Sequence, residues 1–200
     1  MARPRSRTDE EILDAARACF LELGPSVSTT VIAQRVGLSG PALFHRFGSK
    51  QLLLIAAMCP DSSELPLKSL GRAVDERPIP AQLHVIAAEI TDHLKRVMPR
   101  LAVLRAAGIS PLEAWKHYEA PPPLLIHRGL IDWISRALEA GRLRHCHPSH
   151  TASAFMGALQ SQAILHMAGR PIDSPAETES YIEQLVQIFW AGLCPTSDTP

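Results

Sequence analysis

A short segment of this sequence, "GLSGPALFHRFGSK" at residues 37–50, combines side chains that together can bind DNA. Gly40, Pro41 and Ala42 are small, and a helix that inserts into the major groove needs a small leading end so that its backbone can approach the base edges. Pro41 and Ala42 can pack against a thymine methyl, and His45, one turn later, can donate or accept a hydrogen bond at a base edge. We therefore predict a recognition helix within this segment.

Polar residues on either side of this helix are suited to the DNA backbone. Lys50 lies at the start of the next predicted helix, where its charge and the free backbone N–H groups both favour a phosphate. Thr29 and Thr30, at the start of the preceding helix, offer hydroxyls to the flanking backbone or to a base. The spacing alone leaves an alternative open, namely an ordinary helical hairpin whose exposed face is merely solvated.

Four helices are predicted to position these residues. Thr8 and Glu11 are spaced as a capping box, which predicts a first helix over about residues 8–23. Apolar residues recur along it at the spacing of one helical face, and Gly24-Pro25 ends it. Serines stand at the expected N-caps of the second, third and fourth helices: Ser28, Ser39 and Ser49.

The second and third helices are separated only by a turn at residues 37–39. Two short helices joined by a glycine-containing turn of this length are typical of a helix-turn-helix. Leu38 and Leu43 are predicted to face inward, and Phe47 is predicted to anchor the third helix against the first two. The sequence therefore predicts an N-terminal helix-turn-helix DNA-binding domain over residues 1–58.

The composition fits a globular helical protein and argues against a uniformly basic nucleic-acid coat. The 200 residues are 46% hydrophobic and 20% charged, and the formal net charge is zero. Positive charge is concentrated near the N-terminus, because residues 1–50 hold seven Lys/Arg against five Asp/Glu. Arg3, Arg5 and Arg7 precede the first helix, and such an arm either binds phosphates or is simply a solvated start of the chain.

The remaining chain, residues 59–200, is predicted to form a second, all-helical domain. The segments "PDSSELP", "EAPPPLL" and "RHCHPSHT" separate its helices, and nothing demands a strand, so the predicted fold class is all-α. Helices are expected at about 81–107 with an interruption at Pro99, and at about 111–119, 122–141, 149–168 and 176–193.

Cysteine and histidine usage predicts neither a metal site nor a disulfide framework. The four cysteines lie far apart. His145, Cys146, His147 and His150 are metal-ligand types packed together, but they lie in an expected interhelical joint beside Pro148, so solvated loop histidines are the favoured interpretation. No cofactor is predicted. Neither an apolar signal core nor a run of roughly 20 apolar residues is present, so a reduced cytoplasm is the expected location.

Residues 7–58 resemble the N-terminal domain of the TetR (tetracycline repressor) family of bacterial transcriptional regulators. The family pattern is matched by "ILDAARACFLELG" and by "STTVIAQRVGLSGPALFHRFGSKQLL". The positions in register are Ile32, Ala33, Gly37, Leu38, Ser39, Leu43, Phe47, Lys50, Leu52 and Leu53. The resemblance implies that Thr29 and Lys50 bind phosphate. It also implies base contacts by Thr30, Gly40, Pro41, Ala42 and His45.

Two positions depart from the family pattern. Phe44 stands where the family usually has a tyrosine whose hydroxyl binds phosphate, and losing that bond costs about 1 kcal/mol. Arg46 stands where a histidine is common, and we hypothesise that it recovers the lost phosphate contact. If so, Arg46→Ala should lower the salt slope of binding by about one unit. Ser39, Phe44 and Arg46 complete the residues assigned to the DNA interface.

For the C-terminal domain, the resemblance implies a ligand pocket whose occupation moves two DNA-binding domains apart. An effector that prefers the non-binding spacing shifts the population away from DNA. A mostly apolar pocket suits a hydrophobic or aromatic effector. The candidates are polar or soft residues inside apolar helices, for each of which a plain core or surface role is the alternative: His93, Met98, Trp115, Tyr118, His127, Met156, Gln160 and His166.

The last two predicted helices differ from the others. Small residues stand among apolar ones in 152–166, and residues 181–193 have an apolar face wider than one neighbour needs. Both helices either complete the core or pack against a second copy across a two-fold axis. The residues assigned to that dimer interface are Phe155, Leu159, Tyr181, Leu185, Ile188 and Phe189.

The sequence thus predicts a dimeric regulator that binds a palindromic DNA operator, with a repressor released by a small molecule as the favoured role. The alternative is a helical ligand- or metal-sensing protein whose DNA-binding domain is weakened. No enzyme is predicted, because no Ser/His/Asp order, glycine-rich phosphate loop or paired carboxylate stands out.

Overall fold

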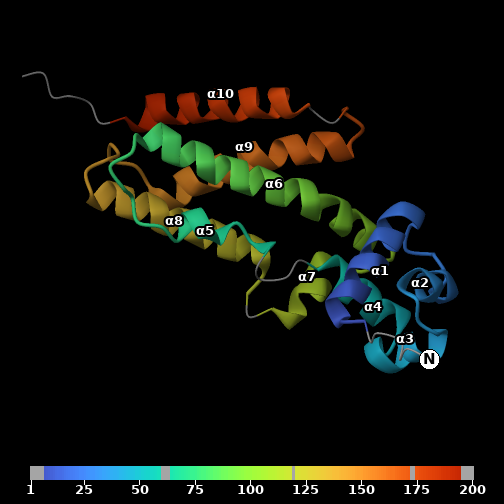
Figure 1. The fold of residues 1–200 in the computed structure, drawn as a ribbon. Helices are drawn as coiled ribbons and strands as arrows, with labels where there is room; N and C mark the ends of the chain where they lie inside the picture. Colours follow the sequence, from blue (N-terminus) through green and yellow to red (C-terminus); the bar gives the residue numbers. More distant parts are fainter. Residues whose placement is uncertain (1–6, 60–63, 119, 172–173, 195–200) are drawn as a thin grey trace, which may run out of the picture. The chain divides into compact units, whose positions relative to one another are not determined.

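The computed structural model describes residues 7–59, 64–118, 120–171 and 174–194. All regular structure in these residues is helical, so the predicted all-α fold is confirmed for the described chain (Figure 1). The elements are α1 (Asp9–Leu23), α2 (Thr29–Val36), α3 (Gly40–Phe47), α4 (Lys50–Met58), α5 (Leu67–Leu70), α6 (Ile79–Ala106), α7 (Pro111–Ala114), the 3-10 turn η2 (Trp115–His117), α8 (Pro122–Glu139), α9 (Pro148–Met167) and α10 (Pro175–Leu193).

The described residues fall into two compact units. Of these residues, the first unit contains 7–59 and 97–118, and the second contains 64–96, 120–171 and 174–194. A division after residue 58 assigns 97–118 to the second domain, whereas the structure groups this segment with the N-terminal helices. Helix α6 is therefore shared, since its last turns belong to the first unit and its earlier turns to the second.

Side-chain caps set the boundaries of the first four helices. Oγ1 of Thr8 accepts a hydrogen bond from the backbone N–H of Glu11, and the Glu11 carboxylate accepts one from the N–H of Thr8, so the predicted capping box is present. The hydroxyls of Ser28, Ser39 and Ser49 each accept from the N–H three residues further on. The predicted N-terminal helices and their caps are confirmed.

The core of the first unit extends beyond the four N-terminal helices. Leu104 and Ala114 are buried in the same apolar cluster as residues of α1, α2, α3 and α4. The thiol of Cys59 donates to the carbonyl oxygen of Ala114 at 3.4 Å, and burial raises the pKa of Cys59 to about 11. This thiol therefore stays protonated at neutral pH and acts as a packed, hydrogen-bonded group rather than a nucleophile.

Helix α6 continues through Pro99, where the sequence predicts an interruption. A proline inside a helix removes one N–H donor and crowds the carbonyl four residues earlier, which favours a kink or a break. Here Pro99 itself is exposed, while Val97, Arg100 and Leu104 around it are buried. Burial on both sides of the proline offsets the lost hydrogen bond, so the helix persists.

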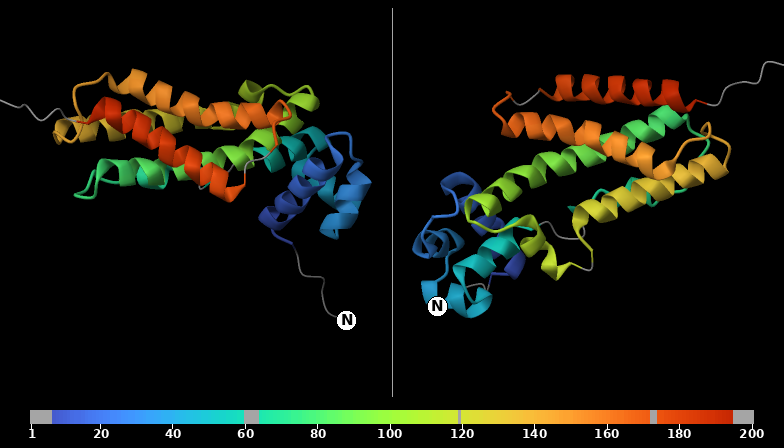
Figure 2. Two further views of the ribbon diagram at one scale, coloured as in Figure 1. Left: turned by 90° about the horizontal axis from the view of Figure 1, so that it is seen from above. Right: turned by 180° about the vertical axis from the view of Figure 1, so that it is seen from behind.

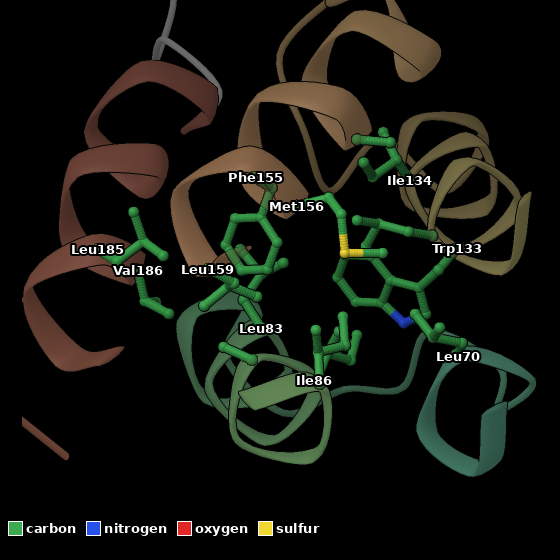
Figure 3. Packing of buried hydrophobic residues seen from close by; sticks show 14 of the residues in the cluster. Leu70, Leu83, Ile86, Trp133, Ile134, Phe155, Met156, Leu159, Leu185 and Val186 are labelled. Atoms are coloured by element: carbon green, nitrogen blue, oxygen red, sulfur yellow. The ribbon is translucent and has the colours of Figure 1, made fainter. Parts of the chain in front are cut away.

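The second unit packs α5, α6, α8, α9 and α10 around its own apolar core. Trp133 of α8 is 1% exposed, and Figure 3 shows its indole lying among Leu70, Ile86 and Met156. Arg136 of α8 donates to the carbonyl oxygen of Leu70 at 2.6 Å, which fixes the short α5 against α8. The core of this unit is thus filled by side chains from all five of these helices.

Helix α10 lies alongside α9 in all three ribbon views (Figures 1 and 2). The phenol of Tyr181 donates to the carbonyl oxygen of Ala158 at 2.6 Å, and the rings of Phe155 and Phe189 meet edge to face with centroids 4.9 Å apart. The C-terminal helices match the predicted positions closely, although the helix predicted at 111–119 is replaced by α7 and η2, which end at residue 117. None of the described helices is long and apolar enough to cross a membrane.

Candidate nucleic-acid interface

Helices α2 and α3 form the predicted helix-turn-helix, and its turn depends on Gly37. This residue ends α2 in the left-handed region at φ 69° and ψ 33°, a conformation that favours glycine. Its N–H bonds back to the carbonyls at the end of α2, and Ser39 then begins α3 by accepting from the N–H of Ala42 at 3.3 Å. Leu43 is fully buried and Leu38 is half-buried, as predicted, so α3 is held by its inner face.

The outer face of α3 carries the residues assigned to the bases. Pro41, Ala42 and His45 are exposed, and Gly40 is half-buried at the start of the helix. A Cβ added to Gly40 would meet no atom of the described protein within 4 Å. The packing of the protein therefore leaves this position open, and a glycine here keeps space for a partner to approach the backbone.

Three polar residues flank this face: the resemblance assigns Thr29 and Lys50 to phosphates and Thr30 to a base. Thr29 and Thr30 are the first two residues of α2, and Lys50 is the first residue of α4. Thr30 is exposed, while Thr29 and Lys50 are half-buried. Helix N-termini combine backbone N–H donors with the positive end of the helix dipole, so both positions have the electrostatics that an anion requires.

Phe44 and Phe47 have different environments on α3. Phe47 is half-buried against the core of the first unit, which agrees with its predicted anchoring role. Phe44 is 42% exposed, beside the residues assigned to DNA. Its ring therefore offers apolar contact at a position where the resemblance implies a tyrosine hydroxyl.

Arg46 is engaged within the protein rather than free at the surface. Its Nε forms an ion pair with Oδ1 of Asp9, and its Nη1 donates to the backbone carbonyl oxygen of Arg7 at 2.7 Å. The hypothesis that Arg46 replaces the missing phosphate contact requires these bonds to be given up. Sequence spacing could not reveal them, because the partners lie 37 and 39 residues away in the chain.

A second arginine of the helix-turn-helix is also paired. Nη1 of Arg35, in the last turn of α2, lies 2.5 Å from Oε2 of Glu22. The hydrogen bond and charge of Arg35 hold the pKa of Glu22 below its ordinary value, and Glu22 raises the pKa of Arg35. Because this pair is exposed to solvent, its main effect is to neutralise charge at the end of α2.

Two family models match the chain. The model described as bacterial regulatory proteins of the tetR family matches residues 12–57, and the model of the C-terminal domain of AefR-like transcriptional repressors matches residues 106–192. Together they span more than half of the chain. This protein belongs to the TetR family.

Solved TetR-family structures share its fold. A crystal structure assigned to the family from Mesorhizobium loti MAFF303099 has a TM-score of 0.75 and 21% identity, covering 97% of this chain and 100% of that one. The flavonoid-responsive regulator FrrA has a TM-score of 0.61 and 22% identity, covering 94% and 97%. SmeT, the repressor of the Stenotrophomonas maltophilia multidrug efflux pump SmeDEF, has a TM-score of 0.59 and 19% identity, covering 96% and 93%. No curated protein matches the sequence.

The residues predicted to line an effector pocket are divided between the two units, and those in the second unit do not lie together. Met98, Trp115 and Tyr118 belong to the first unit, where all three are half-buried. The others belong to the second unit, and they have separate environments there. His93 is buried with Nδ1 3.1 Å from the carbonyl oxygen of Glu64, His127 bonds Ser153, Met156 is part of the core, and Gln160 is half-buried.

The structure does form a small, mostly apolar cavity between α6, α9 and α10, and of the predicted pocket residues only His166 lines it. It has a volume of about 20 Å³. Oγ1 of Thr91 and Oε1 of Gln162 are buried at it, and neither has a hydrogen-bond partner among the described residues. The sequence signal for this cavity is a polar residue within an otherwise apolar helical face, as at Thr91 in α6 and Gln162 in α9. The lining residues are Thr91, Leu94, Lys95, Leu159, Gln162, Ala163, His166, Thr178 and Tyr181.

The residues assigned to a dimer interface are mostly inside the protomer. Phe155 is 2% exposed, Leu159 and Leu185 are buried, and Tyr181 and Phe189 are half-buried in contacts between α9 and α10. Their side chains complete the core, so the apolar pattern of these helices is explained without a second copy. Ile188 is the exception, because it is 68% exposed.

The histidines around the start of α9 lie at the surface: His147 is its N-cap and His150 is in its first turn. The rings of His147 and His150 stack with centroids 3.9 Å apart, and both residues are exposed. Cys146 is half-buried against the core of the second unit. Within the described parts of the chain, no three His, Cys, Asp or Glu side chains are grouped as metal ligands.

Proposed function

We propose that this TetR-family regulator is a homodimeric, sequence-specific repressor that leaves a palindromic DNA operator when a small molecule binds its second unit. The observation that carries the proposal is the outer face of α3, where Pro41, Ala42 and His45 are exposed beside the open backbone at Gly40. Small residues and one hydrogen-bonding ring at a helix start suit insertion into the major groove. Because its target is bacterial DNA, the protein is expected in the cytoplasm.

The similarity of the C-terminal region to known repressors supports repression, rather than activation, of transcription. Residues 106–192 match a model named for AefR-like transcriptional repressors, and SmeT, which shares the fold, is described as a repressor. A dimer that covers a promoter blocks transcription without needing another surface to contact the transcription machinery. Repression is therefore the simplest outcome of the contacts assigned to α2, α3 and α4.

An unpartnered face of α9 and α10 supports dimerisation. Ala154, Gly157, Ser161 and Ile164 are exposed and recur every three or four residues, so they share one face of α9. A Cβ on Gly157 would meet nothing within 4 Å, which leaves room for close approach of a second helix. On α10, Ile188 is an exposed apolar residue. A two-fold axis through this face would bring the same patch of both copies into contact.

The cavity between α6, α9 and α10 supports ligand binding by the second unit. Its lining combines apolar surface from Leu94, Leu159 and Tyr181 with the buried hydroxyl of Thr91 and the amide oxygen of Gln162. A volume of about 20 Å³ has room for about one water molecule, so a larger ligand must separate the helices to enter. Such a ligand binds the opened state better than the closed one, and this difference is what release from DNA requires. The lining fits a small aromatic molecule that carries a hydroxyl.

Thr91→Val tests whether this hydroxyl is kept for a ligand. Valine keeps the branched shape and removes a buried group that has no partner, so the free energy of unfolding is expected to rise by about 1 kcal/mol in urea denaturation. Thr178→Val is the matched control, because the hydroxyl of Thr178 accepts from Nζ of Lys95 at 2.9 Å and should give no such gain. A loss of stability in Thr91→Val would show that the hydroxyl is satisfied in the apo protein and would remove this support for a ligand site.

Selection of duplexes from a random DNA library by the full-length protein tests the function as a whole. We expect an inverted repeat to be enriched, to be bound by a dimer, and to lose affinity steeply with salt as phosphate counterions are released. Binding that is weak and independent of sequence would contradict a specific regulator. It would favour the alternative of a ligand-sensing protein with a weakened DNA-binding domain.

A further inference from the structure

The last turn of α3 is bonded to the chain that enters α1. Arg46 forms an ion pair with Asp9 through Nε, and its Nη1 donates to the carbonyl oxygen of Arg7 at 2.7 Å. The side chain of Arg46 is only one-third exposed, whereas that of Asp9 is 64% exposed at the start of α1. One guanidinium thus bridges a carboxylate and a backbone carbonyl two residues apart, which defines the position of this short segment on α3.

The side chain of Arg7 is placed by the same arrangement. Its guanidinium lies over Gly37, because a Cβ built on this glycine would be 3.7 Å from Nε and 3.8 Å from Nη2 of Arg7. Gly37 ends α2, and a cation is favoured at the C-terminus of a helix by the helix dipole. The charge of Arg7 is therefore held at the turn between α2 and α3, immediately beside the recognition helix.

We propose that Arg46 is a positioning residue that fastens the basic N-terminal arm to the recognition helix, so that Arg7 adds a phosphate contact to those of the helix-turn-helix. This inference rests on the proposed binding of DNA. Arg7 is exposed, and its guanidinium keeps donors for a phosphate oxygen. By sequence, Arg3 and Arg5 precede it and would add further positive charge.

The substitution Asp9→Asn distinguishes the positioning role of Arg46 from a direct phosphate contact by Arg46. If Arg46 binds phosphate itself, Asp9→Asn frees the guanidinium and removes a negative charge near DNA, so binding should become tighter. If Arg46 acts by holding Asp9 and Arg7, the same substitution loosens the arm, so binding should become weaker despite the loss of an unfavourable charge. The two roles predict changes of opposite sign.

Glu10→Gln is the matched control for this substitution. Glu10 lies in the same first turn of α1 and loses the same charge, but no bond to Arg46 is involved. Any general electrostatic gain, and any small loss from weaker interaction with the dipole of α1, will appear in both variants. The difference between Asp9→Asn and Glu10→Gln therefore measures the role of the ion pair with Arg46.

The experiment is titration of the full-length protein and its variants with the selected duplex at several salt concentrations. We expect Asp9→Asn to bind roughly fivefold more weakly than Glu10→Gln, in the range of a single ion pair. We expect Arg7→Ala to lower the slope of log affinity against log salt by about one unit per protomer. In Arg46→Ala, a further Arg7→Ala should then cost little, because the arm is already released.

Two outcomes would overturn the proposal. Asp9→Asn binding as tightly as Glu10→Gln, or more tightly, would show that Arg46 does not act through Asp9. Full additivity of Arg7→Ala and Arg46→Ala would show that the two arginines act independently. A wild-type protein that enriches no duplex would instead refute the proposed DNA-binding function, and this result is obtained before any variant is compared.

Discussion

Ala42→Glu is expected to abolish operator binding while leaving the protein at least as stable as the wild type. Ala42 is exposed on the face of α3 assigned to the bases, so a carboxylate here meets the negative DNA surface. Juxtaposed like charges cost several kcal/mol, and a palindrome repeats the repulsion at both half-sites, which corresponds to a loss of affinity of roughly a thousandfold or more. Fluorescence anisotropy with the selected duplex measures this loss.

The expected effect on stability has the opposite sign. Ser39 is the N-cap of α3 and already accepts from the N–H of Ala42, so glutamate at this third helical position completes a capping box. Its charge also lies in the first turn, where the helix dipole favours an acid, and together these effects contribute about 0.5 kcal/mol.

Ala42→Gln is the control for charge, because glutamine completes the same capping box without a carboxylate. It should retain much more DNA affinity than Ala42→Glu, and both variants should unfold at or above the wild-type denaturant concentration. Wild-type affinity in Ala42→Glu would mean that this face of α3 does not enter the groove, and the assignment of the recognition helix would have to be abandoned.

Ile188→Glu is expected to convert the proposed dimer to monomers. Ile188 is 68% exposed on α10, so the substitution places a charge at the proposed interface without disturbing the core of the protomer. Two linked DNA-binding units gain affinity because binding of the first raises the effective concentration of the second. Loss of the dimer should therefore weaken binding to the full palindrome on the order of a hundredfold. Sedimentation velocity reports the assembly state.

Leu124→Glu provides a matched control for this change. Leu124 is also an exposed apolar residue of the second unit, but it lies on α8 rather than on α9 or α10. This variant should remain dimeric and should bind the palindrome like the wild type. An Ile188→Glu protein that sediments as a dimer would place the interface elsewhere, and the small-residue face of α9 would then need another explanation.

Arg46 shows why residue type alone did not define the DNA interface. From the sequence, an arginine beside the recognition helix is a natural phosphate ligand, and we predicted that role. The side chain instead bonds residues that precede α1, which come close only after α1 and α3 pack together. Whether a charge is available to DNA is decided by which partners the fold brings within hydrogen-bonding distance.

The C-terminal helices illustrate the same distinction for apolar residues. Helical periodicity locates the apolar faces of α9 and α10, but it does not say which neighbour covers each face. Phe155, Leu159 and Leu185 were assigned to a second copy, and the structure buries them against other helices of the same protomer. Likewise, Thr91 and Gln162 became candidate ligand groups only because packing left their oxygen atoms buried at one cavity.

The sequence by itself determined the local elements of the N-terminal region. Thr8, Ser28, Ser39 and Ser49 cap helices by bonding backbone groups three residues away, and Gly37 supplies the left-handed turn, so each signal is complete within a short segment. Only the tertiary structure decided that α6 persists through Pro99, that residues 97–118 join the first unit, and that Arg46 holds Arg7. These features depend on burial and on contacts between segments distant in the chain, and a sequence pattern records neither.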